Sequence, residues 1–128
     1  MSPEASCELA ATETAPAYAR RFLAKALKLW DLDDIDQVVA VLTSELVTNV
    51  VHHGGGQMSL RIRWEPPTLR VEVEDDLSDV PQVRSADPMR DGGRGLRLVE
   101  GLATRWGTKP SCTGKAVWIE MTVKPRSP

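Results

Sequence analysis

Three polar residues at four-residue spacing, Glu45, Asn49 and His53, could form the first part of a binding site. On a helix they fall on one slowly turning stripe, and His52 lies beside it. The first half of this helix is apolar, and a carboxylate or an amide in a buried helix is costly unless it meets a polar partner. The stripe therefore indicates either a ligand site or the place where the helix emerges into solvent near Gly54.

A second candidate is Asp75, whose position predicts a carboxylate on the buried face of a strand. Leu69, Val71 and Val73 alternate with charged residues, and Asp75 continues their parity. A carboxylate at the end of an apolar row either accepts backbone hydrogen bonds or awaits a donor from a ligand, such as an exocyclic amine. The alternative is a strand-end Asp that caps the following turn.

The third candidate is the segment 91–96, DGGRGL, which leads directly into a predicted helix. Glycines let backbone N–H groups approach an anion closely, and the start of a helix is positive. No Lys-Ser or Lys-Thr follows at P-loop spacing, so the segment is not a P-loop. The alternative is a flexible hinge. The candidate phosphate-binding residues here are Gly93, Arg94, Gly95 and Leu96.

Together these features predict a site for Mg²⁺–ATP. Acid and amide oxygens suit Mg²⁺, the helix start suits phosphates, and the inward Asp75 suits the amine of adenine. Residues 76–93 are rich in Asp, Pro and Gly and lack periodicity. A loop of this length in a small domain is usually functional or disordered, and we expect it to act as a lid over ATP.

Helices are predicted over 14–30, 34–53 and 94–105. Thr14 could cap the first helix, and Asp33 or Asp34 the second. Residues 38–42 are apolar on every side, which indicates a helix buried within a layer. The expected buried stripe of the first helix consists of Tyr18, Phe22, Ala26 and Trp30.

Strands are predicted where the period drops to two. Residues 58–64 and 69–75 read as a β-hairpin with one buried face and opposite charges on the other, and 117–123 as a final strand. Weaker patterns mark strands at 106–112 and 8–11. The expected fold is an α/β (α+β) two-layer sandwich, with a mostly antiparallel mixed sheet and three helices on one face.

Composition indicates a single domain over 1–128. The formal net charge of −2 and the pI near 5.7 argue against a protein that coats nucleic acid or an anionic membrane. No apolar stretch approaches the ~20 residues needed to span a bilayer, and the acidic first 15 residues do not resemble a secretory signal. Cys7 and Cys112 read as reduced thiols of a cytoplasmic protein.

The motifs resemble those of the GHKL ATPases, the superfamily of gyrase, heat-shock chaperone and histidine-kinase ATP domains. Residues 45–54 resemble the N-box, 71–75 with Ser78 and Pro81 the G1 segment, and 93–99 the G2 box. Residues 114–118 resemble the segment that opens the last strand. The resemblance covers about residues 6–124 and is closest to the stand-alone bacterial branch, the anti-sigma factors of the serine-kinase type.

This resemblance implies a Bergerat-type sandwich that binds ATP between the helix layer and the sheet. Asn49 would bind Mg²⁺, Asp75 would hold the adenine amine, and Gly93 and Gly95 would let the lid and the helix start wrap the phosphates. Glu45 would be the general base that activates a Ser hydroxyl of a partner protein.

The implied function is that of an anti-sigma factor, which sequesters a sigma factor and phosphorylates the antagonist that displaces it. Arg94 or Arg97 could stabilise the transferring phosphoryl group. The G1 segment lacks the Asp-x-Gly-x-Gly of much of the superfamily, and Lys115 and Ala116 stand where the family often has an adenine-binding Thr.

Two other functions stay open at this stage. The missing Thr favours a regulator on the same fold that acts by protein contact, with weak ATP binding or none. A metal-dependent hydrolase using His52 and His53 is the third hypothesis, although no His-Glu-x-x-His motif is present.

Trp118 has outward parity on its strand, which indicates either a homodimer surface or an aromatic on the open sheet face.

Overall fold

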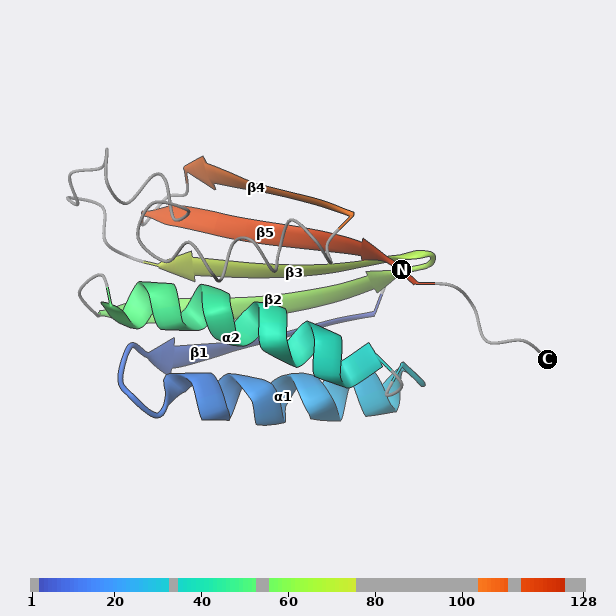
Figure 1. Ribbon diagram of the computed structural model, residues 1–128, viewed down its shortest axis with the longest axis horizontal. Helices are drawn as coiled ribbons and strands as arrows, with labels where there is room; N and C mark the ends of the chain where they lie inside the picture. Colours follow the sequence, from blue (N-terminus) through green and yellow to red (C-terminus); the bar gives the residue numbers. More distant parts are fainter. Residues whose placement is uncertain (1–2, 33–34, 53–55, 76–103, 111–113, 124–128) are drawn as a thin grey trace.

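The structure is a computed structural model that describes residues 3–32, 35–52, 56–75, 104–110 and 114–123 (Figure 1). The elements, in chain order, are β1 (Glu4–Ala10), α1 (Ala15–Leu29), α2 (Asp36–His52), β2 (Gln57–Glu65), β3 (Thr68–Asp75), β4 (Arg105–Pro110) and β5 (Lys115–Thr122).

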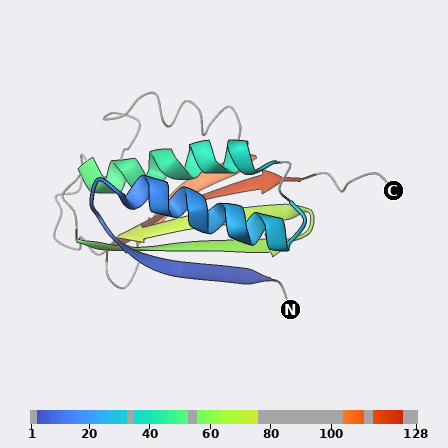
Figure 2. The same ribbon diagram turned by 90° about the horizontal axis from the view of Figure 1, so that it is seen from below.

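The strands form one sheet in the order β1-β2-β3-β5-β4, and every neighbouring pair is antiparallel. Both helices cover the same face, α1 over β1 and β2 and α2 over β3 (Figure 2). The predicted two-layer α+β sandwich is therefore confirmed, with described strands that are antiparallel rather than mixed. Most of the helix predicted at 94–105 lies outside the described residues, but its end is wrong, because Arg105 begins β4.

The hairpin of β2 and β3 forms the centre of the inner face, as its alternation predicts. Leu60 pairs with Val73 and Ile62 with Val71, and all four side chains are buried. Pairing one apolar residue opposite another fixes the register, because a slip of one residue would turn the whole apolar row to solvent. Asp75 occupies the last position of this row.

The buried stripe of α1 differs from the prediction. Tyr18 is 55% exposed, and Phe22 and Trp30 are only partly buried. Four residues advance a helix by about 400°, so residues at strict four-residue spacing drift by about 40° per step and cannot all stay on one face. The stripe that faces the core consists of Ala15, Ala19, Leu23, Ala26 and Leu27.

The start of α1 also differs in detail. Thr14 occupies the N-cap position but makes no side-chain cap hydrogen bond, and its hydroxyl lies 3.0 Å from that of Thr12. Pro16 stands in the first turn, where a missing N–H costs nothing. The predicted caps of α2, Asp33 and Asp34, lie outside the described residues.

The helix α2 is less buried than expected. Its core face is formed by Val39, Leu42, Leu46, Val47 and Val50. Val41 is 43% exposed, so the expectation of an apolar helix buried on every side is wrong at this residue. The cause is the two-layer architecture, which leaves the side of a helix opposite the sheet open to solvent.

The first strand is longer than the sequence indicates. It spans Glu4–Ala10 rather than 8–11, because it pairs with β2 along its whole length. Cys7 on this strand is a free, half-buried thiol that packs against the core, and burial raises its pKa. Cys112 lies outside the described residues.

The outer face of the sheet carries a network of charges around Trp118. Arg70 donates a hydrogen bond to Glu120 at 2.8 Å, and its guanidinium lies 4.5 Å from the centroid of the Trp118 ring. Arg105 also donates to Glu120, from Nε at 3.1 Å. Gly107 opposes Trp118, and a Cβ at this position would lie 2.8 Å from the indole ring. The outward parity of Trp118 is confirmed, and a side chain of this same chain covers its ring.

This network makes stability depend on pH through Glu120. Burial opposes ionisation of this carboxyl, but the hydrogen bonds and charges of Arg105 and Arg70 outweigh it and hold the pKa of Glu120 below its ordinary value. A depressed folded-state pKa contributes stability above the unfolded-state pKa, and that stability is lost as the pH falls through the folded value. We expect Glu120→Gln to reduce the loss of unfolding free energy between pH 7 and about pH 3.5, measured by urea denaturation.

The matched control is Glu74→Gln on the same face of the sheet, a residue with no ion pair among the described side chains. If both variants changed the pH dependence equally, the two arginines would not be its cause.

Candidate functional site

The candidate site lies at one end of the sandwich. The C-terminal end of α2, the end of β3 and the start of β5 meet there (Figure 1). Asp75, the last residue of β3, pairs with Met58 on β2 and with Lys115 on β5. Asp75 therefore lies at the end of the sheet where α2, the helix of Glu45 and Asn49, terminates.

Asp75 is 4% exposed, so its predicted place on the buried face is confirmed. The other buried carboxylate within the described ranges, Glu72, lies on the outer face, where Lys109 and Arg70 contact it at 3.2 and 3.8 Å. An ionised carboxylate has two acceptor oxygens, so Asp75 at the end of the apolar row can accept a hydrogen bond from an amine of a ligand. This position fits the base of a nucleotide.

Glu45 and Asn49 are both partly buried on α2. The orientation of α2 follows from a contact with its neighbour, because Arg20 of α1 donates a hydrogen bond to the Ser44 hydroxyl at 3.2 Å. At about 100° per residue, Glu45 is displaced from Ser44 by about 100° and Asn49 by about 140°. Ser44 lies on the side of α2 next to α1, and the buried Val50 marks the core side. Glu45 and Asn49 lie beyond that core side, on the flank of α2 that faces away from α1.

The remaining sequence candidates divide into two groups. His52 is exposed at the last position of α2. The others lie outside the described residues: His53, Gly93, Arg94, Gly95, Leu96, Arg97 and the predicted lid, 76–93.

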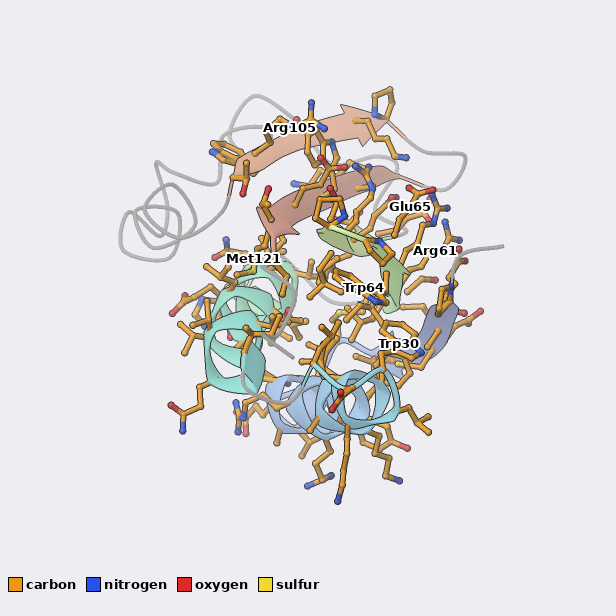
Figure 3. All side chains as sticks on the ribbon, turned by 90° about the vertical axis from the view of Figure 1, so that its right-hand side faces the viewer. Trp30, Arg61, Trp64, Glu65, Arg105 and Met121 are labelled. Carbon is orange, nitrogen blue, oxygen red and sulfur yellow. The ribbon has the colours of Figure 1, made fainter. Side chains whose placement is uncertain are left out.

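The opposite end of the sandwich contrasts with this polar end. Trp30 at the end of α1, Trp64 near the end of β2 and Met121 near the end of β5 are partly buried and pack against the core. Figure 3 views this end and shows Trp30 and Trp64 between the helix layer and the sheet. Large apolar side chains thus close one end of the core, while the polar candidates on α2 and β3 gather toward the other.

Two hollows lie elsewhere, on the outer face of the sheet. One of about 350 Å³ is lined by Ser6, Cys7, Glu8, Ser59, Arg61, Glu72 and Glu74. The other, of about 160 Å³, is lined by Arg61, Arg63, Arg70, Glu72 and Lys109. Each cation of the smaller hollow already contacts a carboxylate, since Arg61 and Arg63 reach Glu4 at 3.6 and 3.1 Å. We therefore interpret this charged face as a structural network.

No group of three or more His, Cys, Asp or Glu side chains occurs in the described part of the chain in an arrangement that could hold a metal ion. A metal-dependent hydrolase thus gains no support from these residues. Mg²⁺ behaves differently, because it keeps several waters and commonly takes only one or two protein oxygens together with substrate phosphates. A single amide such as Asn49 is compatible with that mode of binding.

The described residues thus form an α+β sandwich in which the polar candidates of α2 and β3 lie toward one end. Residues 8–121 match the family of the histidine kinase-like ATPase domain, and the chain belongs to this family. Membership is consistent with ATP binding and confirms the superfamily that the N-box, G1 and G2 motifs indicate. A comparison with curated proteins finds no match. Within the described ranges, no helix is long and apolar enough to cross a membrane.

Sequence reasoning missed the contact between Arg20 and Ser44, which joins α1 to α2 immediately beside Glu45. Arg20 and Ser44 are 24 residues apart in the sequence. Their contact depends on how α1 and α2 pack against each other, and no local spacing carries that information.

Proposed function

We propose that this protein is an ATP-dependent serine-protein kinase that acts as an anti-sigma factor. It would bind a sigma factor, and it would transfer the γ-phosphoryl group of Mg²⁺–ATP to a Ser of the antagonist that releases this sigma factor. The observation that carries the proposal is the buried Asp75 at the end of the sheet where α2, the helix of Glu45 and Asn49, terminates. Membership of an ATPase domain family supports it.

In this proposal Asp75 accepts a hydrogen bond from the adenine amine. The carboxylate is acceptor-only when ionised, and its position next to Val73 and Met58 places it beside apolar side chains suited to a purine ring. Asn49 would supply one oxygen ligand to Mg²⁺, an ion that commonly keeps several waters and binds substrate phosphates. When bound, the ion would supply the neutralisation of phosphate charge that phosphoryl transfer requires besides positioning.

Glu45 serves as the general base. Its carboxylate takes the proton from the Ser hydroxyl as the Ser oxygen bonds to the γ-phosphorus. The bond between the γ-phosphorus and the oxygen of the β-phosphate breaks, and ADP leaves. Glu45 lies one helical turn before Asn49 on the same flank of α2, so the base and the metal ligand face the same space.

A specific observation favours the second candidate, a non-catalytic regulator that acts by protein contact. Ala116 is 1% exposed and has no side-chain hydrogen-bonding group, and Lys115 is the cross-strand neighbour of Asp75. Neither supplies the hydroxyl that the family often provides to adenine. Loss of one neutral hydrogen bond weakens binding by roughly tenfold at most, so the site would keep measurable affinity.

The test is calorimetric titration with Mg²⁺–ATP of the wild-type chain, Asn49→Ala and Gln37→Ala. Gln37 is an exposed amide in the first turns of the same helix, so its variant controls for loss of an amide from α2. We expect Asn49→Ala to weaken binding by at least about tenfold and Gln37→Ala to leave it unchanged.

Removing Mg²⁺ with a chelator should make the ATP affinities of the wild type and Asn49→Ala equal, because the amide acts through the metal. Absence of binding by the wild type at millimolar nucleotide would reject the kinase proposal and favour the protein-contact regulator.

A further inference from the structure

The helix α1 carries a row of positive charge with no acidic residue within the helix. It contains Arg20, Arg21, Lys25 and Lys28 and no acidic residue, in a chain whose net charge is −2. Arg21, Lys25 and Lys28 are exposed, and their spacing of four and then three residues places them on one stripe. We call these three residues the basic stripe.

The basic stripe differs from the cations of the outer sheet face in its partners. No cation of the stripe forms an ion pair with a carboxylate in the described ranges. Arg21 instead lies over the ring of Tyr18 at 5.6 Å from its centroid. On the sheet, Arg63 and Arg70 lie 3.1 and 2.8 Å from a carboxylate oxygen of Glu4 and Glu120. Among the described residues, the cations of the sheet face are therefore paired with carboxylates, and those of the basic stripe are not.

Two large apolar side chains stand at the ends of this stripe. Tyr18 is 55% exposed and Leu29 is 83% exposed. The only other large apolar side chain with comparable exposure in the described residues is Val41 on α2. Apolar anchors on either side of aligned charges are typical of a surface that recognises a protein segment, because charge alone needs no such anchors.

We propose that the outer side of α1 binds an acidic amphipathic helix of a protein partner. Carboxylates at four- and three-residue spacing on that helix would match the basic stripe, and an apolar residue toward each end would cover Tyr18 and Leu29. The α1 helix lies at the edge of the helix layer with one side turned away from the sheet (Figure 2), so a second helix can approach it lengthwise. This binding is independent of the proposed ATP chemistry.

The observations favour an acidic protein segment over DNA and over an anionic membrane. Three aligned cations are fewer than the six to ten phosphate contacts of a typical DNA-binding surface. A helix that lies on a membrane turns its apolar face to lipid, but the apolar face of α1, with Ala19, Leu23 and Leu27, is committed to the core.

The experiment measures fluorescence anisotropy of a labelled helical peptide of roughly 20 residues, with glutamates at the matching spacing and a leucine toward each end. The peptide control carries glutamine in place of glutamate. The protein variants are Arg21→Gln/Lys25→Gln/Lys28→Gln and, with the same loss of charge on the sheet face, Arg61→Gln/Arg63→Gln/Lys109→Gln.

At low salt we expect the α1 variant to lose about tenfold in affinity for the acidic peptide, and the sheet variant to bind within about twofold of wild type. Tyr18→Ser should also weaken binding, because the anchor is lost without any change in charge. Equal losses in both charge variants, or equal binding of the glutamine peptide, would overturn the proposal.

Vesicles of phosphatidylserine and phosphatidylcholine and a DNA duplex are titrated in parallel. Tighter binding of either one than of the peptide, with the same dependence on the basic stripe, would reject a protein partner. Calorimetry with Mg²⁺–ATP should give the same affinity for the α1 variant as for wild type. A chain that binds no ATP but still binds the peptide would reject the proposed kinase alone.

Discussion

Glu45→Gln is expected to lower the rate of phosphoryl transfer to an antagonist protein by about 10²–10⁴-fold and to leave Mg²⁺–ATP binding nearly unchanged. Glutamine has the shape of glutamate and a similar helix propensity, so α2 should keep its structure. What it lacks is a basic oxygen that can take the Ser proton. Transfer would be measured with γ-labelled ATP and purified candidate antagonist proteins under single-turnover conditions.

The control for this variant is Glu74→Gln, which makes the same chemical change on the outer face of the sheet and should transfer phosphate at the wild-type rate. Weak binding of ATP by Glu45→Gln would mean that the carboxylate acts in the ground state, as a ligand of Mg²⁺ or of its waters. Full activity of Glu45→Gln would exclude Glu45 as the base. Both results concern Glu45 alone and leave the assignments of Asn49 and Asp75 to their own tests.

The strands of the hairpin could be predicted from the sequence because strict alternation of apolar and polar residues is typical of a strand with one buried face. Leu60, Ile62, Val71 and Val73 alternate with polar residues, and only one register buries all of them. The edge strands were harder. β4 reads RWGTKP, with little alternation, and its identity is decided by pairing with β5, a contact that no local pattern contains.

Helix faces were predicted less well than strands for a geometric reason. A four-residue repeat is close to the helical repeat but not equal to it, and over the twelve residues from Tyr18 to Trp30 the error grows to about a third of a turn. The structure resolves the ambiguity by burying two small residues, Ala15 and Ala19, which the expected stripe does not include. The same drift turns Asn49 by about 40° from Glu45 toward the core side of α2, although both stay on its flank.

The candidate site was predictable where it depends on parity and only partly where it depends on packing. The burial of Asp75 follows from its place in the row of Leu69, Val71 and Val73, and the structure confirms it. The flank on which Glu45 and Asn49 lie could not be assigned without knowing where α1 packs, which the contact between Arg20 and Ser44 establishes. The charges of the basic stripe can be located in the sequence, but which described residues they contact depends on the folded chain.

Asp75 carries the strongest test of the nucleotide site. We expect Asp75→Asn to weaken Mg²⁺–ATP binding by about 10- to 100-fold, because a hydrogen bond to a charged acceptor is replaced by one to a neutral amide oxygen. A more selective effect is expected on the preference of the site for adenine over another nucleobase. The amide of Asn can also donate, so the variant should tolerate the O6 carbonyl of inosine triphosphate, which the carboxylate of the wild type repels.

The ratio of the two affinities, ATP over inosine triphosphate, should therefore be large in the wild type and close to one in Asp75→Asn, as measured by competition against a fluorescent ATP analogue. A ratio of affinities does not depend on the fraction of folded protein, which matters for a substitution at a residue that is 4% exposed. Thermal unfolding without nucleotide distinguishes adenine binding by Asp75 from a purely structural role in capping a turn. If Asp75 caps the turn after β3, Asp75→Asn would lower the melting temperature and leave the nucleotide preference unchanged.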